Sequence, residues 1–232
     1  MRLHTTTAFS LSTLTVLALA GCSTRSTPAD DPASSAPAPA RQEGKNASTP
    51  ALLSSAELSK RLLDESDLGE GYTRKPQQPQ RHDDVAVSGC PALDKLGGDA
   101  AVDGGLDFPR KAKASFAYEG GSNSEVAEEL YSGTEDNLSK GVGQIFGAMT
   151  SCPTYQVLGG STSVTVTAQK ALAARLGDEQ WSQLLTFSSG GRSSIVKQTA
   201  VRTGTVVVVV AGSPGLVDAH LAKAVGKVRR TR

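Results

Sequence analysis

Thr205-Val206-Val207-Val208-Val209-Val210-Ala211 contains five consecutive valines. β-Branched residues favour strands, and a run without polar alternation is typical of a strand that is buried on both faces. The run therefore predicts a central strand around which the rest of a sheet is built. The turn Thr203-Gly204 connects it to a second extended stretch, Ile195 to Arg202, which follows the turn Gly190-Gly191.

Upstream of this pair, four further segments alternate apolar with polar residues, the period-2 pattern of strands that bury one face. These segments are residues 112–118, 126–132, 164–168 and 181–187. Residues 126–132 also fit a helix, and the strand is favoured. The first two are joined by the turn residues Gly120-Gly121. Because short glycine turns connect consecutive segments, the chain predicts an antiparallel sheet of about five or six strands.

Three helices are predicted from apolar residues at helical spacing. The first begins at a capping box at Ser54 and ends at the turn Gly69-Glu70-Gly71. The second is capped by Thr134 and ends at Cys152-Pro153, and the third follows Ser213-Pro214. Their apolar stripes lie within residues 58–63, 138–149 and 217–228.

The resulting fold class is α+β, with the helices packed mainly on one face of the antiparallel sheet. Between the first helix and the first strand, residues 72–84 are expected to form a loop, because Pro76 and Pro79 interrupt any strand pattern. Residues 90–96 are expected to form one short turn of helix.

The N-terminus indicates where the chain works. Residues 1–21 have a positive start at Arg2, an apolar run from Ala8 to Ala20 and a small-residue cleavage site, which together predict an export signal. The apolar run is shorter than the roughly 18 to 20 residues of a membrane span. Leu19-Ala20-Gly21-Cys22 resembles the lipobox of bacterial lipoproteins, in which the cysteine thiol receives a diacylglycerol. We therefore predict that Cys22 is lipidated and holds the chain on the cell membrane, facing outside the cytoplasm.

Residues 22–51 are rich in Ser, Thr, Ala and Pro, and predict a disordered tether that carries a folded domain over residues 52–232. Cleavage of the signal removes one basic residue, so the formal net charge falls from +1 to 0. Without a basic stripe, binding to nucleic acid is not expected. The mature chain keeps Cys90 and Cys152, and in an exported protein such a pair predicts a structural disulfide. Two free thiols and a redox-active couple are the alternatives.

The strongest catalytic motif is Gly212-Ser213-Pro214-Gly215, which nearly matches a nucleophile elbow. Its first glycine is missing, and the later His220 lies two turns along the same helix, too far to reach Ser213. Ser as a helix N-cap followed by Pro explains the same residues, so no catalytic site is predicted. An envelope hydrolase using Ser213 or scattered acids is the least favoured reading.

Metal and ligand motifs are weak. His82-Asp83-Asp84 has no second cluster at metal spacing, and the acids 99, 103 and 107 lack the order of a calcium loop, so no metal site and no cofactor are predicted. Asp178-Glu179 is expected to be a charged turn rather than a paired-carboxylate site. Trp181, the only tryptophan, is expected in the core and is the first candidate for ligand contact if exposed. The basic end, residues 223–232, either complements the last helix or touches anionic lipid.

Several of these motifs together resemble the PknH-type extracellular sensor-like domain: the lipobox, the tether, Asp67-Leu68-Gly69-Glu70-Gly71-Tyr72, Cys152-Pro153, Leu176-Gly177-Asp178-Glu179, and the valine strand with its helix. That domain occurs on bacterial receptor kinases and on stand-alone lipoproteins. The resemblance covers residues 52–228 and implies an antiparallel sheet flanked by helices, with a cleft for an unidentified ligand. This chain lacks a kinase domain, and has one cysteine pair where the receptor domain has two disulfides.

The sequence thus favours a non-enzymatic, lipid-anchored module that binds a small molecule or an envelope protein. This prediction is based on the lipobox, the long tether, the domain with one cysteine pair and the lack of an assembled catalytic set. A carrier of lipid or another apolar ligand is the alternative, and it needs a large cavity between sheet and helices.

Overall fold

The computed structural model divides into two units, residues 1–46 and 47–232, and describes residues 51–77, 85–97, 108–120, 124–159 and 162–230. All of these belong to the second unit. Its helices are α1 (Ser55–Ser59), α2 (Glu65–Leu68), α3 (Pro91–Asp94), α5 (Glu135–Ser151) and α6 (Pro214–Arg230). Its strands are β1 (Tyr72–Arg74), β2 (Val85–Ser88), β3 (Lys111–Tyr118), β4 (Ser124–Ser132), β5 (Thr154–Gly159), β6 (Thr162–Lys170), β7 (Glu179–Ser189), β8 (Arg192–Thr203) and β9 (Val206–Gly212).

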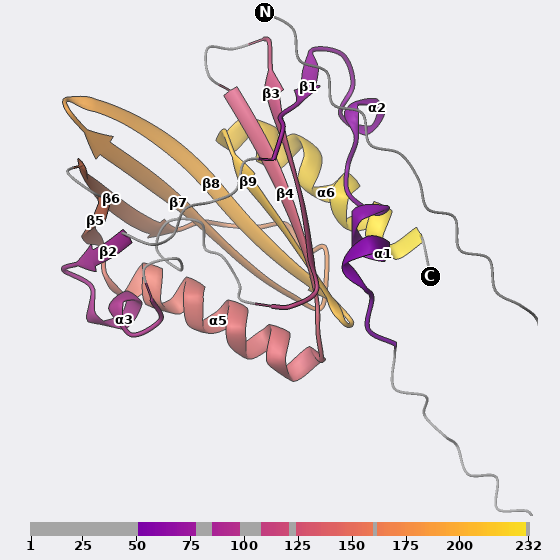
Figure 1. The fold of residues 1–232 in the computed structure, drawn as a ribbon, viewed down its shortest axis with the longest axis horizontal. Helices are drawn as coiled ribbons and strands as arrows, with labels where there is room; N and C mark the ends of the chain where they lie inside the picture. The colour runs from indigo at the N-terminus through magenta and orange to yellow at the C-terminus, as the bar shows by residue number, and fades with distance from the viewer. Residues whose placement is uncertain (1–50, 78–84, 98–107, 121–123, 160–161, 231–232) are drawn as a thin grey trace, which may run out of the picture. The chain divides into compact units, whose positions relative to one another are not determined.

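The described strands form one antiparallel sheet of nine strands in the order β1-β3-β4-β9-β8-β7-β6-β5-β2 (Figure 1). The prediction of five or six strands was therefore too low. The six predicted strands are present, and β1, β2 and β5 were missed. β1 and β2 have only three and four residues, too few to show a periodic pattern, so their pairing depends on the neighbouring strand. β1 also lies within residues 72–84, which were expected to be entirely loop.

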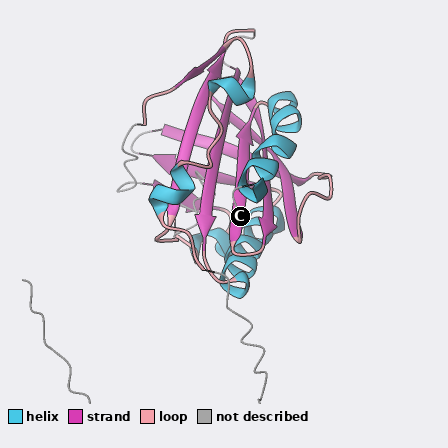
Figure 2. Cartoon of the chain, turned by 90° about the vertical axis from the view of Figure 1, so that its right-hand side faces the viewer, coloured by secondary structure: helices cyan, strands magenta, loops and turns pink. Residues whose placement is uncertain are grey.

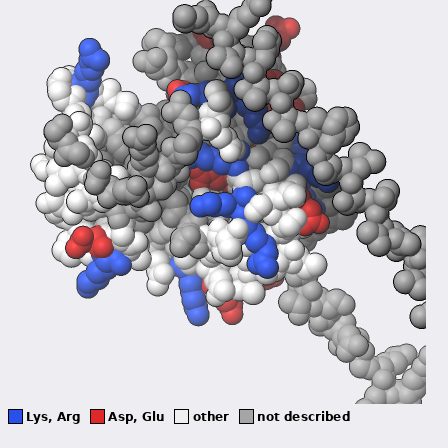
Figure 3. Space-filling model, in the orientation of Figure 1, with Lys and Arg blue, Asp and Glu red and all other residues white. Residues whose placement is uncertain are grey.

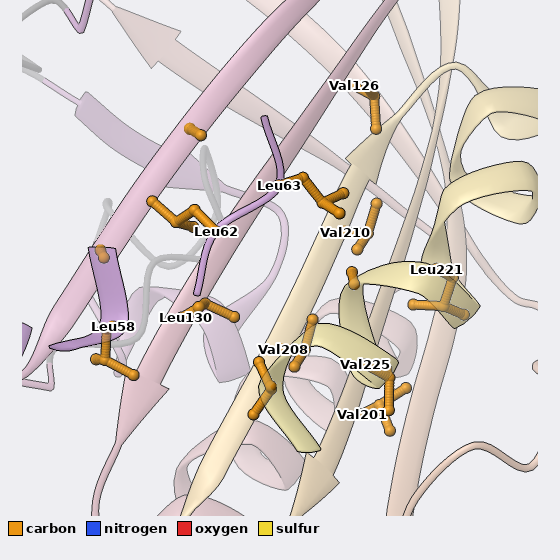
Figure 4. Packing of buried hydrophobic residues seen from close by; sticks show 14 of the residues in the cluster. Leu58, Leu62, Leu63, Val126, Leu130, Val201, Val208, Val210, Leu221 and Val225 are labelled. Atoms are coloured by element: carbon orange, nitrogen blue, oxygen red, sulfur yellow. The ribbon is translucent and has the colours of Figure 1, made fainter. Parts of the chain in front are cut away.

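The valine strand, β9, lies between β4 and β8, as predicted for a central strand. All five valines are buried. Val207 and Val209 belong to a core cluster with α5, whereas Val206, Val208 and Val210 belong to a cluster with α6 and the α1–α2 segment. Figure 4 shows Val208 and Val210 of this second cluster beside Leu221 and Val225 of α6. Because successive side chains of a strand point to opposite faces, one strand contributes to two cores.

The helices therefore lie on both faces of the sheet, not mainly on one as predicted. α5 packs against strands β6–β9 from one face, and α6 packs against β8, β9 and β4 from the other. In Figure 2 the helices (cyan) lie outside the layer of strands (magenta). The prediction failed because five uninterrupted valines require an apolar cover on each face, and a single helical layer supplies only one.

The first predicted helix is divided into α1 and α2. The capping box at Ser54 is present, and a second one forms at Asp64, whose carboxylate accepts a hydrogen bond from the backbone N–H of Asp67 at 3.1 Å. The new cap restarts the helix after an extended residue. Because the helix is interrupted here, Leu58, Leu62 and Leu63 can all be buried on the α6 face.

Strand β3 has an outer edge that β1 pairs only in part, through residues 116–118. The rest of this edge is occupied by hydrogen bonds from other segments. The backbone N–H of Lys75 donates to Ser115 O at 2.8 Å, the side-chain amide of Gln77 donates to Lys113 O, and Lys111 N–H donates to Ser55 Oγ at 3.1 Å. The described part of the chain thus covers β3 along its length.

Gly212 ends β9 in a conformation that the fold requires. Its φ of +144° is strained for other residues, and a Cβ there would lie 2.1 Å from the carbonyl oxygen of Glu125. We expect Gly212→Ala to lower the free energy of unfolding by about 3 kcal/mol or more, because backbone strain adds to the clash. The midpoint of urea unfolding measures this change.

Gly215→Ala is the matched control, since a Cβ at Gly215 meets nothing within 4 Å and the residue lies in the first turn of α6. This variant should be neutral or gain up to about 1 kcal/mol from helix propensity. Equal losses for the two variants would contradict the assigned role of Gly212.

Candidate functional site

A disulfide joins α3 to α5. Cys90 immediately precedes α3 and Cys152 immediately follows α5, and their Cα atoms are 5.6 Å apart across the bond. The predicted pairing is confirmed. The bond closes a separation of 62 residues, and the chain-entropy account gives a loop of this length roughly 4 kcal/mol of stabilisation. It therefore fixes a four-residue helix, too short to be stable alone, against the end of a long one.

A groove lies between these two helices. The α5 wall is one stripe at helical spacing, formed by Gln144, Gly147, Ala148 and Ser151. The opposite wall is formed by Ala92, Lys95 and Leu96, in and just after α3. The groove has a volume of about 380 Å³, at the lower end of the range of small-ligand sites.

The lining of the groove is mostly apolar, and its polar residues are Lys95, Gln144 and Ser151. Leu96 is 40% exposed, a large fraction for a leucine beside a packed core. The Ser151 hydroxyl donates to the Ala148 carbonyl at 2.8 Å, so its proton is used within α5. Lys95 carries the only charge among the lining residues. This arrangement suits a small ligand with an apolar body and an anionic group.

Gly147 keeps the α5 wall open. A Cβ at this position would meet nothing within 4 Å, so packing within the domain does not require glycine here. Glycine also costs a helix about 1 kcal/mol relative to alanine. Gly141 on the same helix differs, because a Cβ there would lie 2.8 Å from the Phe108 ring. Glycine at 147 therefore leaves space in the groove that a side chain would occupy.

Trp181 does not line the groove. It is half-buried on β7 and packs against the core cluster on the α5 face. Its indole nitrogen would lie 3.8 Å from a Cβ at Gly143 of α5. Trp181 is thus partly buried against the core, and a contact between Trp181 and a ligand stays a prediction.

The acidic pair Asp178-Glu179 forms ion pairs around Arg202. The Arg202 Nε lies 2.7 Å from a Glu179 oxygen, and its terminal nitrogen lies 3.4 Å from Asp178. Glu179 also accepts from Ser139 of α5 at 3.0 Å, and the hydrogen bond with Arg202 lowers the pKa of Glu179. The charged turn is therefore a structural connection between β7, β8 and α5, and its carboxylates are engaged.

The elbow-like serine and its histidine make separate contacts. Pro214 begins α6 as predicted, and the Ser213 carbonyl accepts from Leu216 and Val217 at the start of the helix. The Ser213 hydroxyl instead accepts from the backbone N–H of Glu125, at 3.4 Å. His220 Nε2 lies 2.6 Å from the Tyr72 hydroxyl. The structure thus brings Ser213 and His220 to different partners.

Three basic residues of α6 contact the body of the domain. Lys227 pairs with Asp64 at 3.0 Å and also with Asp67, Lys223 donates to the Asp67 carbonyl, and Arg229 donates to the Leu176 carbonyl. Contact of the basic end with lipid remains untested. Among the residues that the structure describes, no group of three or more His, Cys, Asp or Glu side chains could hold a metal ion. Cys22, residues 82–84 and the acids 99, 103 and 107 lie outside the described residues.

A buried carboxyl was missed by the sequence analysis. Glu128 of β4 is 1% exposed and lies on the α6 face, where the backbone N–H of Leu63 donates to one of its oxygens at 2.6 Å. Its other oxygen has no hydrogen-bond partner among the described residues. Burial raises the pKa of Glu128 to about 7, partly offset by that hydrogen bond and by Lys227. Glu128 alternates in phase with Val126 and Leu130, so the strand pattern already placed its side chain on the buried face, a signal that the sequence analysis did not use.

Comparison with known proteins identifies the fold. No protein family's sequence profile matches the chain, and no curated protein does. Among solved structures, the extracellular domain of PknH from Mycobacterium tuberculosis superposes with a TM-score of 0.58 and 17% identity, over 78% of this chain and 98% of that one. The chain is similar in fold to the PknH extracellular domain. An uncharacterised Mycobacterium smegmatis protein, an Rv0999 ortholog, matches at TM-score 0.40 and 13% identity, over 71% of this chain and 93% of that one.

This likeness to the PknH extracellular domain supports the resemblance read from the sequence at the level of fold. It covers most of this chain, and nearly all of the PknH domain. The match concerns backbone architecture, so it assigns no ligand-contacting residue. No helix of the described segments is long and apolar enough to cross a membrane.

Glu128 generates a pH prediction. Its pKa is about 7 in the folded chain against an ordinary value of 4.5. Between these values the folded state binds more protons at Glu128 than the unfolded state, so the contribution of Glu128 to stability is greatest below pH 4.5 and is lost as pH rises through 7. From pH 4 to pH 8, the wild-type chain should lose about 3 kcal/mol more of its unfolding free energy than Glu128→Gln. Chemical denaturation at each pH measures the difference.

Glu129→Gln is the control for this pH series. Glu129 is the next residue on β4, and its carboxylate lies 2.7 Å from the Lys113 ammonium. Glu129→Gln should lose as much unfolding free energy between pH 4 and pH 8 as the wild-type chain. If Glu128→Gln and the wild-type chain show the same pH profile, folding does not raise the pKa of Glu128 and the assignment is wrong.

Proposed function

We propose that this chain is a non-enzymatic, sensor-like module on the outer side of the cell membrane, anchored by lipid on Cys22, which binds a small ligand in the groove between α3 and α5. The observation that carries the proposal is the groove itself, whose two walls are held together by the Cys90–Cys152 disulfide. The similarity in fold to an extracellular domain supports the outward-facing location.

The anchor is supported by the leader and by the cysteine usage of the chain. A structural disulfide is typical of an oxidising compartment outside the cytoplasm. The lipobox at 19–22 provides an attachment point, and two or three acyl chains give stable anchoring where one does not. The intervening segment up to residue 51 would let the folded unit stand away from the lipid surface.

A non-catalytic role is supported by the engagement of the reactive side chains. The serine and histidine of the elbow-like motif contact Glu125 and Tyr72 respectively. The paired acids 178 and 179 hold Arg202. In the groove, Lys95 and Ser151 can position a ligand, yet the set lacks a general base beside a nucleophile, which covalent catalysis requires.

The groove is tested with anilinonaphthalene sulfonate, a fluorescent probe with an apolar body and one anionic group. The wild-type chain should enhance its fluorescence. Gly147→Leu should weaken probe binding at least tenfold, because the side chain fills the groove, and Lys95→Glu should weaken it about threefold to tenfold through charge repulsion. Titration of the full mature chain at fixed ionic strength measures both constants.

Two substitutions serve as matched controls for the groove. Gly226→Leu replaces a glycine of α6 where a Cβ would also meet nothing within 4 Å. Lys140→Glu reverses an exposed charge on α5 outside the groove. Both should leave binding of the probe unchanged. Equal effects of test and control variants would place the probe elsewhere and reject the groove as the site.

The anchor is tested by Cys22→Ser in the full chain expressed in a bacterial host. Without the thiol the lipid cannot be attached, so the protein should move from the washed membrane fraction to the soluble exported fraction. The wild-type chain should stay with the membrane after a salt wash, and its mass should show the acyl groups. Retention of the serine variant on washed membranes would reject lipid anchoring through Cys22.

A further inference from the structure

One half of the sheet has a face that α6 and α1 do not cover. α6 packs on β8, β9 and β4, and α1 packs on β3 and β4. Strands β2, β5, β6 and β7 extend beyond them, with α3 and α5 on their other face. The open face is defined by alternate residues of these strands and of the β8 start: Ala86, Ser88, Thr154, Gln156, Leu158, Ser163, Thr165, Thr167, Gln169, Leu184, Thr186, Ser188, Ser193 and Ile195.

The open face carries no charge. Eight of its fourteen residues are Ser or Thr, two are Gln, and four are apolar, although 20% of the chain is charged. The charged pair Lys197–Asp218, at 2.5 Å, lies where α6 begins to cover the same side of β8. Figure 3 shows a few charged side chains at the margins of the left-hand surface and more of them at the centre and right.

The residues of the open face form rows across the strands. Thr154, Thr167, Thr186 and Ile195 are successive cross-strand partners, and so are Ser88, Gln156, Thr165, Ser188 and Ser193. Most side chains in these rows are short. Ile195 is 55% exposed and Leu158 is 37% exposed, so two large apolar side chains stand on this surface.

This composition excludes several kinds of partner. Nucleic acid and acidic surfaces require Lys or Arg, which the open face lacks. Flat sugar rings are commonly held by aromatic side chains, and none of the fourteen residues is aromatic. A charged protein surface docked here would lose water around its ions and gain no counter-charge. An uncharged partner surface fits these limits best, and a second copy of the open face is such a surface.

We propose that the open face binds the open face of a second copy of this chain, as a symmetric pair. A two-fold interface places the same patch on both sides, and an uncharged patch can do so without like-charge repulsion. Two sheets pack face to face at about 10 Å with their side chains interdigitated, which rows of Ser, Thr and Gln with Leu158 and Ile195 permit. Ile195 and Leu158 supply the apolar contacts, and the hydroxyl rows supply hydrogen bonds.

The size of the face predicts a weak pair. Four strands about 4.8 Å apart, with about six residues at 3.3 Å each, give roughly 400 Å² per copy. Stable complexes bury about 800 Å² per partner, so dimerisation in dilute solution is unfavourable. Copies confined to one membrane by their lipid meet at a high effective concentration, which favours the pair. This last step rests on the anchor in the proposed function.

The test uses the mature lipidated chain in phosphatidylcholine liposomes, with donor and acceptor dyes on a cysteine placed at the exposed Lys140 of α5, away from the open face. Energy transfer should increase with the density of the chain. Ile195→Glu should reduce the association constant at least tenfold, because it buries a charge against an uncharged surface. Leu172→Glu, at a residue that is 94% exposed and outside the open face, is the matched control and should leave transfer unchanged.

Flotation of the same liposomes separates the two proposals. If the chain does not float with lipid, anchoring has failed, and self-association is then read from sedimentation at high protein concentration with the same two variants. Equal energy transfer, or equal sedimentation, for the wild-type chain and Ile195→Glu would overturn the pairing of open faces. A glycan or another protein found on this face by native mass spectrometry, and displaced by Ile195→Glu, would overturn it as well.

Discussion

The structure depends on the two-sided burial of β9. Its five valines pack alternately against one helical layer on each face, and burial of each contributes about 1.5–3 kcal/mol only if the layer on its own face is present. The sheet therefore cannot lose α5 or α6 without exposing alternate valines. This constraint places the groove and Glu128 on opposite sides of the same strand system. The groove belongs to the α5 layer, and Glu128 to the layer of α6 and the α1–α2 segment.

The two layers are secured by different means. On the α5 side the disulfide holds a short helix against the end of a long one, so the groove has covalently linked walls. On the α6 side the N-terminal segment is held by leucines, by Lys227 with its two aspartates and by the hydrogen bond to Glu128. These contacts are noncovalent and include a titratable buried group. The α6 layer is thus the more sensitive to pH and solution conditions.

Much of the fold could be predicted from the sequence because periodic patterns are local. Alternation identified four strands, and the valine run and its flanking turns identified β9 and β8. Helical spacing identified α5, with its cap at Thr134, and α6. The groove could not be predicted, because its two walls are about 50 residues apart in the sequence. Its open space also depends on the missing side chain of Gly147, which matters only once the helices are in place. Glu128 was missed although its position on β4 is in phase with the buried residues of that strand. Its carboxylate becomes buried only when the Leu63 segment is laid over it, and no local pattern records that contact.

The hydrogen bonds on the outer edge of β3 limit how copies of the chain can associate. A sheet grows by adding strands to an edge whose backbone groups are open. At β3, Ser55, Lys75 and Gln77 already occupy those groups along the length of the strand. Fibrillar polymerisation through this edge would first have to displace three contacts made by the chain's own neighbouring segments. The contacts at β3 therefore disfavour cross-β deposits that begin at this edge, even where many copies of the chain lie close together.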